Sequence, residues 1–258
     1  MLSSNKNLQL ERLTELFLMK AEMASYHQPG TCTFYGTANF NQMLMEFIGL
    51  HLPGSSFVNP GTELREELTK WGTQRSLQIT ALGNEFTPLS VILDERAFVN
   101  GIVGLMATGG STNLVLHLPA MARAAGIILC HEDFDEISSV IPLMAKVYPN
   151  GLADVNHFHA AGGLGFMIRQ LLDKGFLHEN VKTVVGDGLR LYTKEPKLTD
   201  KDLKFVTTGN KSQNEKILRS ASKPFQKTGG LKKLEGFLGI GVIKVSSVKP
   251  EHLIVEAP

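Results

Sequence analysis

A cysteine stands in a turn whose composition suits sulfur chemistry. Residues 29–39 read Pro-Gly-Thr-Cys-Thr-Phe-Tyr-Gly-Thr-Ala-Asn, and a helical pattern follows directly. Backbone amides at a helix N-terminus stabilise a thiolate, so Cys32 suits a nucleophile or a metal or cluster ligand. The alternative is a small buried cysteine. One thiolate is too few for an iron–sulfur cluster, which usually takes three or four ligands.

A second segment has the composition of an anion-binding turn. Residues 107–113 read Ala-Thr-Gly-Gly-Ser-Thr-Asn. The glycines let a ligand approach the backbone, and Ser111, Thr112 and Asn113 add side-chain donors beside the free amides of a helix start. This arrangement suits a carboxylate or a phosphate. No Lys follows the glycines, so it is not a Walker motif. The alternative is close helix packing with an ordinary cap.

The remaining candidate residues favour structural roles. His157 and His159 have no third histidine or carboxylate at a metal-ligand spacing, so no other metal site is predicted. In the same segment, Asp154 and Asn156 are predicted to cap and begin a helix. Two isolated residues in apolar surroundings, Cys130 and His117, are predicted to lie in the core.

These segments need helices to position them. Apolar residues at intervals of three and four predict helices over 6–26, 39–49, 63–80, 111–125, 134–147 and 158–175. Thr62 is the expected N-cap of the third helix, and Pro119 is expected to kink or split the fourth. Residues 186–230 are polar and predict an exposed connector. Residues 239–248 and 252–256 have strand-like β-branched content.

The composition excludes several classes of protein. The chain has 258 residues, with 26 Lys and Arg against 25 Asp and Glu, so no global field attracts nucleic acid. Two cysteines are too few for a disulfide scaffold. No apolar stretch reaches the roughly 18 residues of a membrane helix, and the N-terminus lacks the pattern of a signal peptide. We therefore expect a cytoplasmic protein with no membrane partner.

Five segments together resemble one enzyme family. They are residues 29–39, 52–58 (Leu-Pro-Gly-Ser-Ser-Phe-Val), 107–113, 121–127 (Met-Ala-Arg-Ala-Ala-Gly-Ile) and 156–163 (Asn-His-Phe-His-Ala-Ala-Gly-Gly). In order and spacing they closely resemble the dihydroxy-acid/6-phosphogluconate dehydratase family. The form Cys-Thr-Phe-Tyr-Gly-Thr-Ala-Asn is similar to its phosphogluconate branch.

The resemblance implies a reaction and a cofactor. Water would be removed from 6-phospho-D-gluconate to give 2-dehydro-3-deoxy-6-phospho-D-gluconate, a step of the Entner–Doudoroff pathway. Hydroxide leaves poorly, so a Lewis acid must hold the departing oxygen while a base takes the proton. The family implies a 4Fe-4S cluster for the first task, often with Mg or Mn, and a homodimer. Cys32 matches one of three cluster cysteines, and Gly110, Ser111, Thr112 and Asn113 are expected to contact the substrate.

The resemblance also implies a division of the chain. The expected fold class is α/β, with a helix-rich partial N-terminal domain over 1–205 and a connector with the first strands of a β-rich C-terminal domain over 206–258. The other two cluster cysteines would precede the helix at 6–26, and the catalytic base would follow Pro258. We therefore expect the chain alone to be inactive and to self-associate. The alternatives are a dehydratase of another aldonic or dihydroxy acid, and a non-catalytic remnant or dimerisation module.

Overall fold

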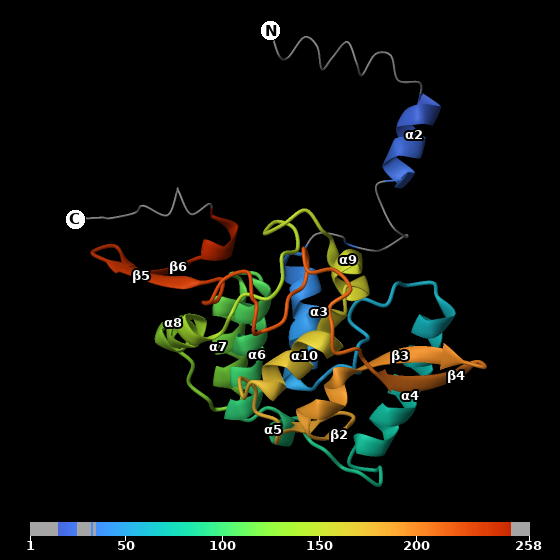
Figure 1. Cartoon of the computed structure of the whole chain (residues 1–258). Coiled ribbons are helices and arrows are strands. Elements are labelled where there is room, and N and C mark those ends of the chain that lie inside the picture. The colour runs from blue at the N-terminus through green and yellow to red at the C-terminus, as the bar shows by residue number, and fades with distance from the viewer. Residues whose placement is uncertain (1–14, 25–31, 33–34, 249–258) are drawn as a thin grey trace.

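Two buried helices form the centre of the molecule. The computed structural model describes residues 15–24, 32 and 35–248. Helix α3 (Thr37–Ile48) packs along α6 (Glu95–Thr108), and α7 (Leu114–Ala124), α8 (His131–Val140) and α10 (Gly163–Asp173) surround them (Figure 1). The central helices bury large apolar side chains, including Phe40, Leu44, Phe47, Phe98 and Met106. Removing these side chains from water is the main source of stability.

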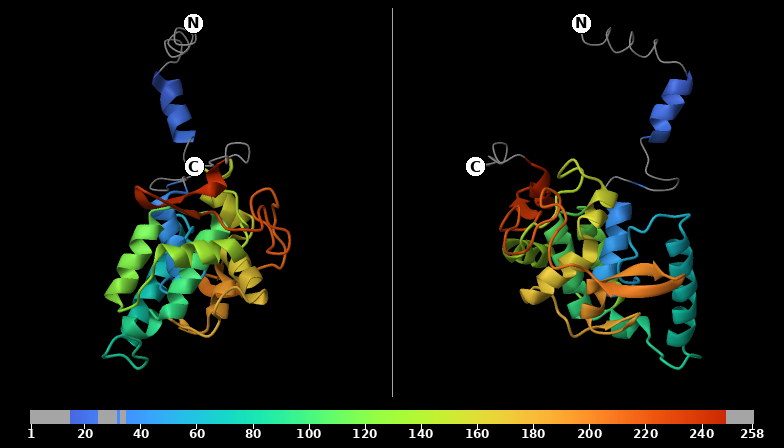
Figure 2. Two further views of the ribbon diagram at one scale, coloured as in Figure 1. Left: turned by 90° about the vertical axis from the view of Figure 1, so that its left-hand side faces the viewer. Right: turned by 45° about the vertical axis from the view of Figure 1, so that its right-hand side comes forward.

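Of the remaining described helices, three lie around this centre, and a fourth stands apart from it. Helix α4 (Glu63–Ile79) and the short α5 (Leu89–Ile92) connect α3 to α6 along the chain, and α9 (Val155–Ala160) precedes α10. Helix α2 (Glu15–Ala24) stands away from the body in every view of Figures 1 and 2. None of the described helices is long and apolar enough to cross a membrane.

Three antiparallel pairs of strands complete the described part of the chain. Strand β1 (Lys182–Thr183) pairs with β2 (Gly186–Asp187), β3 (Lys194–Thr199) with β4 (Asp202–Thr207), and β5 (Lys232–Gly236) with β6 (Gly239–Ile243). Short 3-10 helices cover Leu189–Thr193 and Val245–Ser247. The β3–β4 pair lies beside α4 (Figure 2). There the rings of Trp71 and Phe205 pack edge to face, with their centroids 5.5 Å apart.

Most of the predicted elements are confirmed, and the α/β, helix-rich fold class with them. Helix α4 begins after Thr62, whose hydroxyl accepts the N–H of Arg65 at 3.3 Å. The helix predicted over 6–26 is present at Glu15–Ala24, and its other residues lie outside those the structure describes. Pro119 lies inside α7, which continues past it to Ala124. Of the strand predicted over 239–248, Gly239–Ile243 form β6, whereas Val245–Ser247 form a 3-10 helix. Residues 252–256 lie outside the described part.

Three predicted elements were wrong in part. The helix expected over 134–147 begins at His131 and ends at Val140, because residues after it run extended and pair with distant segments, Leu143 with Gln226 and Ala145 with Leu218. The helix expected over 158–175 is two helices, α9 and α10, separated at Ala161 and Gly162. The predicted exposed connector over 186–230 contains the β3–β4 pair and buried side chains at Leu189, Tyr192 and Leu218. The domain boundary at 205/206 stays a prediction.

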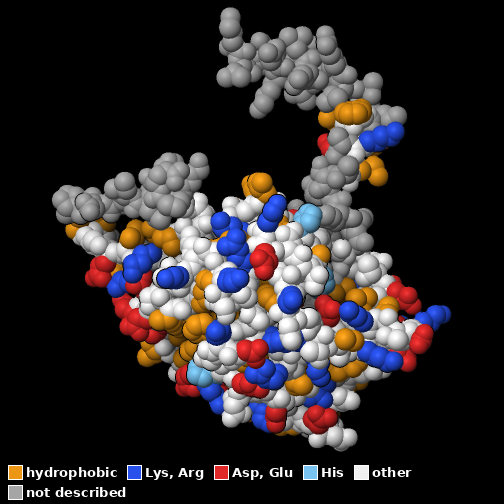
Figure 3. All heavy atoms as spheres, in the orientation of Figure 1, with side chains coloured by type: hydrophobic (Ala, Val, Ile, Leu, Met, Phe, Trp, Pro, Cys, Tyr) orange, Lys and Arg blue, Asp and Glu red, His pale blue; other side chains and the backbone are white. Residues whose placement is uncertain are grey.

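Charged side chains of both signs are interspersed on the surface. On the face shown in Figure 3, Lys and Arg stand among Asp and Glu over most of the body. Several charged side chains of the described residues pair with one another; Arg190, for example, contacts both Glu179 and Asp173. Exposed pairs of this kind contribute at most about 1 kcal/mol each to stability. The folded chain therefore depends on its apolar core.

Candidate functional site

Cys32 is held next to the start of α3. The side-chain amide of Asn39 donates to the carbonyl oxygen of Cys32 at 2.7 Å, and the N–H of buried Tyr35 donates to the carbonyl of Tyr148 at 3.1 Å. Cys32 itself is exposed and is not in a disulfide. Its exposure excludes the alternative of a buried structural cysteine.

The turn over residues 52–58 folds back onto α3 and binds a buried carboxyl. Glu46 Oε2 accepts the N–H of Gly54 at 2.7 Å, and Glu46 Oε1 accepts the N–H of Ser56 at 2.9 Å. The hydroxyl of Ser56 lies 2.9 Å from the carbonyl oxygen of Gln42. Burial raises the pKa of Glu46 to about 7, although hydrogen bonds from Ser56 and Gly54 act to lower it. A carboxyl that titrates near neutral pH thus holds this turn.

Arg65 binds the same turn from its other side. This residue lies in the first turns of α4, and its Nε donates to the carbonyl of Val58 at 3.0 Å. Its Nη2 donates to the carbonyl of Ser55 at 2.9 Å and also to that of Val58. Burial lowers the pKa of Arg65 and the charge of Glu46 raises it, and a guanidinium keeps its charge under such opposing shifts. Residues 54–58 are therefore fixed between Glu46 at their amides and Arg65 at their carbonyls.

The N-terminus of α9 forms the opposite wall. The Asp154 carboxylate accepts the N–H of His157 at 2.9 Å, which confirms its predicted role as the N-cap. Asn156 lies in the first turn of this helix, as predicted. Its Nδ2 is buried and has no hydrogen-bond partner among the described residues. A buried amide without a partner costs free energy, so it calls for a ligand or a water.

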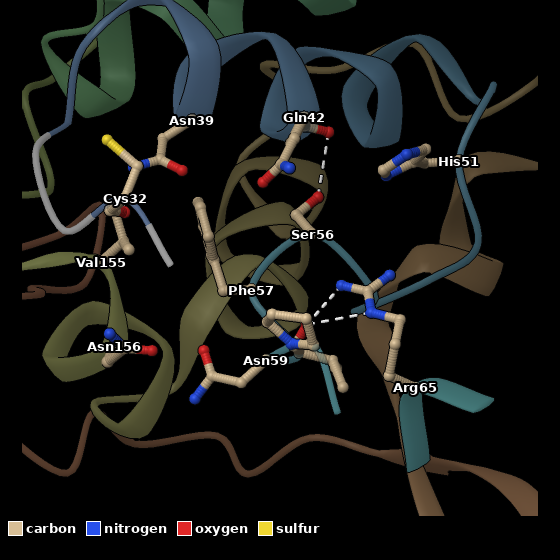
Figure 4. A pocket seen from close by; sticks show the side chains of 12 residues that line it. Cys32, Asn39, Gln42, His51, Ser56, Phe57, Asn59, Arg65, Val155 and Asn156 are labelled. Atoms are coloured by element: carbon tan, nitrogen blue, oxygen red, sulfur yellow. Dashed lines mark hydrogen bonds between the residues drawn. The ribbon is translucent and has the colours of Figure 1, made fainter. Parts of the chain in front are cut away.

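These segments enclose a cavity of about 340 Å³. Its walls come from the Cys32 segment, α3, residues 51–60, the start of α4 and the start of α9. The lining residues are Cys32, Asn39, Gln42, His51, Ser56, Phe57, Val58, Asn59, Pro60, Arg65, Val155 and Asn156. In Figure 4, Cys32 and Asn156 lie on one side, and His51 and Arg65 lie on the other. The volume is at the lower end of the roughly 300–1,000 Å³ of small-molecule sites.

The turn predicted to bind substrate lies beside this cavity and does not line it. The hydroxyls of Ser111 and Thr37 are 2.9 Å apart, and Asn113 Nδ2 donates to Thr37 Oγ1 at 2.7 Å. Thr112 is partly exposed, whereas Gly110 is buried against Phe40. The turn is thus attached to the first residue of α3. Substrate contacts by Gly110, Ser111, Thr112 and Asn113 stay a prediction.

The structure corrects two predicted core residues. Cys130 is exposed, because it precedes α8 at the surface, where its Sγ donates to Asp133 Oδ2 at 3.2 Å. His117 is also exposed, since it lies on the outer face of α7. His157 and His159 lie on a helix, with His157 near Asp154 and His159 half-buried, and burial lowers the pKa of His159. Neither histidine lines the cavity.

The described residues match one ligand of an iron–sulfur cluster and no complete set. Exposed Cys32 is suited to binding iron by its thiolate. Among the described residues, no group of three or more His, Cys, Asp or Glu side chains could hold a metal ion. The whole chain has two cysteines, and the second, Cys130, lies at the start of α8, where its thiol donates to Asp133. A cluster on Cys32 would therefore need ligands besides those that the described residues supply.

Two residues of the cavity, Arg65 and His51, were missed by the sequence reasoning. Arg65 lies in a helix that reads as an ordinary surface helix, and His51 follows α3 in a segment that reads as a turn. Their neighbours at 52–58 were noticed for their resemblance to a family. A basic residue and a histidine flanking such a turn are the signal that was available.

Comparison with known protein families gives a match over most of the chain. Residues 2–192 match the family described as "Dihydroxy-acid/6-phosphogluconate dehydratase N-terminal". The chain belongs to this dehydratase family.

Within the family, the sequence identity is higher to phosphogluconate dehydratases than to a dihydroxy-acid dehydratase. The chain is 60% identical over 242 residues to the phosphogluconate dehydratase of Rhizobium meliloti (strain 1021), covering 93% of this chain and 40% of the relative. It is 51% identical over 247 residues to that of Escherichia coli (strain K12), covering 96% and 41%. A dihydroxy-acid dehydratase of Caldanaerobacter subterraneus is 32% identical over 249 residues, covering 96% and 42%. The chain thus spans about two fifths of the length of these relatives.

Proposed function

We propose that this chain supplies the substrate-binding part of a phosphogluconate dehydratase. The reaction would remove the C2 proton and the C3 hydroxyl of 6-phospho-D-gluconate as water, giving 2-dehydro-3-deoxy-6-phospho-D-gluconate. The observation that carries this proposal is that residues from three motifs line one polar cavity: Cys32 and Asn39, the 56–58 part of the turn, and Asn156. The relatives at 51% and 60% identity, which are phosphogluconate dehydratases, support the choice of substrate.

The chain's own residues would bind and orient the substrate. The cavity offers amide and hydroxyl groups from Asn39, Gln42, Ser56, Asn59 and Asn156. Such groups suit the hydroxyls of a sugar acid, and each unpaired hydroxyl in a closed site costs affinity. A cluster held partly by Cys32 would supply Lewis-acid chemistry for the departing oxygen.

Further properties belong to the same proposal. We expect a cytoplasmic enzyme, because its phosphorylated substrate carries charges that do not cross a bilayer unaided. A homodimer, Mg or Mn beside the cluster, and substrate contacts by the 110–113 turn stay predictions for the complete enzyme.

An exchange of segments tests the proposed reaction. The part of the Rhizobium meliloti enzyme that matches this chain is replaced by the corresponding residues of this chain, and keto acid release from 6-phosphogluconate is measured after anaerobic assembly of the cluster. We expect turnover within about tenfold of the parent enzyme, a difference of about 1.4 kcal/mol in the barrier. A hybrid that keeps the parent's cluster absorbance and acts on a different dihydroxy acid, or on none, would overturn the proposal.

A further inference from the structure

The cavity has a cationic end and a thiol end. Of its lining residues, three have titratable side chains: Cys32, His51 and Arg65. Figure 4 shows His51 and Arg65 together, across the cavity from Cys32. None of the described lining residues is a carboxylate, and Glu46 lies behind the 52–58 turn, where it faces the turn amides. An elongated anion would therefore enter with its charge toward Arg65.

The guanidinium of Arg65 is fixed before any ligand binds. Its Nε and Nη2 donate to the carbonyls of Val58 and Ser55. No described residue accepts a hydrogen bond from its Nη1, so two N–H donors remain for a ligand. A guanidinium held in this way loses little side-chain entropy on binding an oxyanion.

His51 stands beside this guanidinium and is held by its own backbone. The carbonyl of His51 accepts the hydroxyl of Tyr192 at 2.6 Å, and its N–H donates to the carbonyl of Met45 at 3.2 Å. Its Nδ1 is 3.5 Å from the hydroxyl of Ser55, at the limit of a hydrogen bond. The imidazole is thus positioned at the cavity wall with a ring nitrogen available to a ligand.

We propose that Arg65 and His51 form the subsite for the terminal phosphate of the substrate. This inference rests on the proposed function, because that function provides a substrate with a phosphate at the end remote from the reacting carbons. It fixes the direction of binding: the phosphate lies at the α4 end, and the carboxylate with C2 and C3 lies toward Cys32 and Asn156. A phosphate monoester suits this end because a guanidinium binds its oxygens with charge-assisted hydrogen bonds.

The opposite direction of binding makes a different prediction. If Arg65 bound the substrate carboxylate, its removal would weaken the binding of gluconate, which has the carboxylate and no phosphate. If Arg65 binds the phosphate, gluconate affinity is unaffected, whereas 6-phosphogluconate and inorganic phosphate both bind less well.

Calorimetric titration of the full chain with three probes tests the proposal. The probes are 6-phosphogluconate, gluconate and inorganic phosphate, and the variants are Arg65→Gln and His51→Asn. Because Arg65 also holds the 52–58 turn, thermal unfolding of each variant is measured beside its binding, and His51→Asn gives a second test that leaves those turn contacts intact. Arg96→Gln is the matched control, since Arg96 is exposed and pairs with Asp94 outside the cavity.

The expected result is selective for phosphate. In Arg65→Gln, the affinity for 6-phosphogluconate falls by about ten- to hundredfold, as for the loss of a hydrogen bond to a charged group. His51→Asn lowers the affinity for the phosphate-containing probes by a smaller factor and leaves gluconate affinity unchanged. Arg96→Gln changes none of the affinities. Equal losses for gluconate, no loss in either cavity variant, or no binding of 6-phosphogluconate to the unaltered chain would overturn the subsite. A hybrid enzyme that dehydrates 6-phosphogluconate with an unchanged KM in both variants would overturn the subsite while leaving the proposed function intact.

Discussion

The carboxyl of Glu46, buried in α3, accepts the backbone N–H of Ser56 at 2.9 Å, and so fixes the turn that forms one wall of the cavity. Ser56 reaches the cavity from this turn, and Arg65 binds the carbonyls on its other side. The wall therefore depends on Glu46, which titrates near neutral pH, and on Arg65, which keeps its charge.

Glu46 makes stability depend on pH in a defined direction. Its pKa is raised from 4.5 to about 7 by burial, so the folded chain holds a proton that the unfolded chain has lost between these values. Its contribution to stability is therefore full below about pH 4.5 and falls as the pH rises to about 7. The total change is about 3 kcal/mol, at about 1.4 kcal/mol per pKa unit.

Urea unfolding of the wild type and of Glu46→Gln at several pH values measures this change. Between pH 4.5 and 7, the unfolding free energy of the wild type should fall relative to that of Glu46→Gln. Above about pH 7, the difference between the two should stay constant. A difference that does not vary with pH would contradict the assignment to Glu46.

Gly110 is predicted to be required for packing whether or not it contacts substrate. A Cβ at this position would stand 2.2 Å from Cε2 of Phe40, a fully buried side chain of α3. Gly110→Ala should therefore lower the unfolding free energy by about 1–3 kcal/mol, as overpacking does. The matched control is Gly72→Ala in α4, where the nearest atom, in Leu52, is 3.5 Å away. That change should be neutral or stabilise by up to about 1 kcal/mol. Similar effects of both changes in denaturant unfolding would contradict this account.

Local signals in the sequence predicted the elements that depend on local interactions. Helix α4 was predicted from Thr62 and its apolar spacing, and the structure confirms both the cap and the helix. The end of α8 was not predicted, because Leu143 and Ala145 after it pair with Gln226 and Leu218, more than 70 positions away. Tyr192 likewise lies in a polar segment and is fully buried, since its hydroxyl binds His51 across the fold.

In the candidate site, too, the sequence predicted residues marked by their own segment but not contacts between distant segments. Cys32 and the N-cap Asp154 were found from their own segments. The partnership of Arg65 with Ser55 and Val58 could not be found this way, because it depends on how the 52–58 turn returns to α4. Nor could the sequence show that Ser111 and Asn113 would meet Thr37, more than 70 positions earlier.

Binding of a phosphate beside His51 should take up a proton. Burial and the charge of Arg65 lower the pKa of His51 below 6.5, so this imidazole is neutral at pH 7 in the free chain. A phosphate dianion close to it raises that pKa, so the affinity for 6-phosphogluconate should fall as the pH rises from the pKa of the free imidazole to that of the bound one.

Titrations at pH 7 in buffers of different ionisation enthalpy measure the number of protons taken up. Uptake should be larger for the wild type than for His51→Asn, and Arg96→Gln should match the wild type. The same uptake in wild type and His51→Asn would show that a different group receives the proton.

The most direct test of the cavity as the substrate site uses the two cysteines of the chain. Both Cys32 and Cys130 are exposed, but Cys32 lines the cavity and Cys130 lies outside it at α8. The rate at which iodoacetamide alkylates each cysteine is followed by mass spectrometry with and without 6-phosphogluconate. We predict that saturating 6-phosphogluconate slows alkylation of Cys32 several-fold and leaves Cys130 unchanged. Unchanged alkylation of Cys32, or equal slowing of both cysteines, would contradict the assignment of this cavity to the substrate.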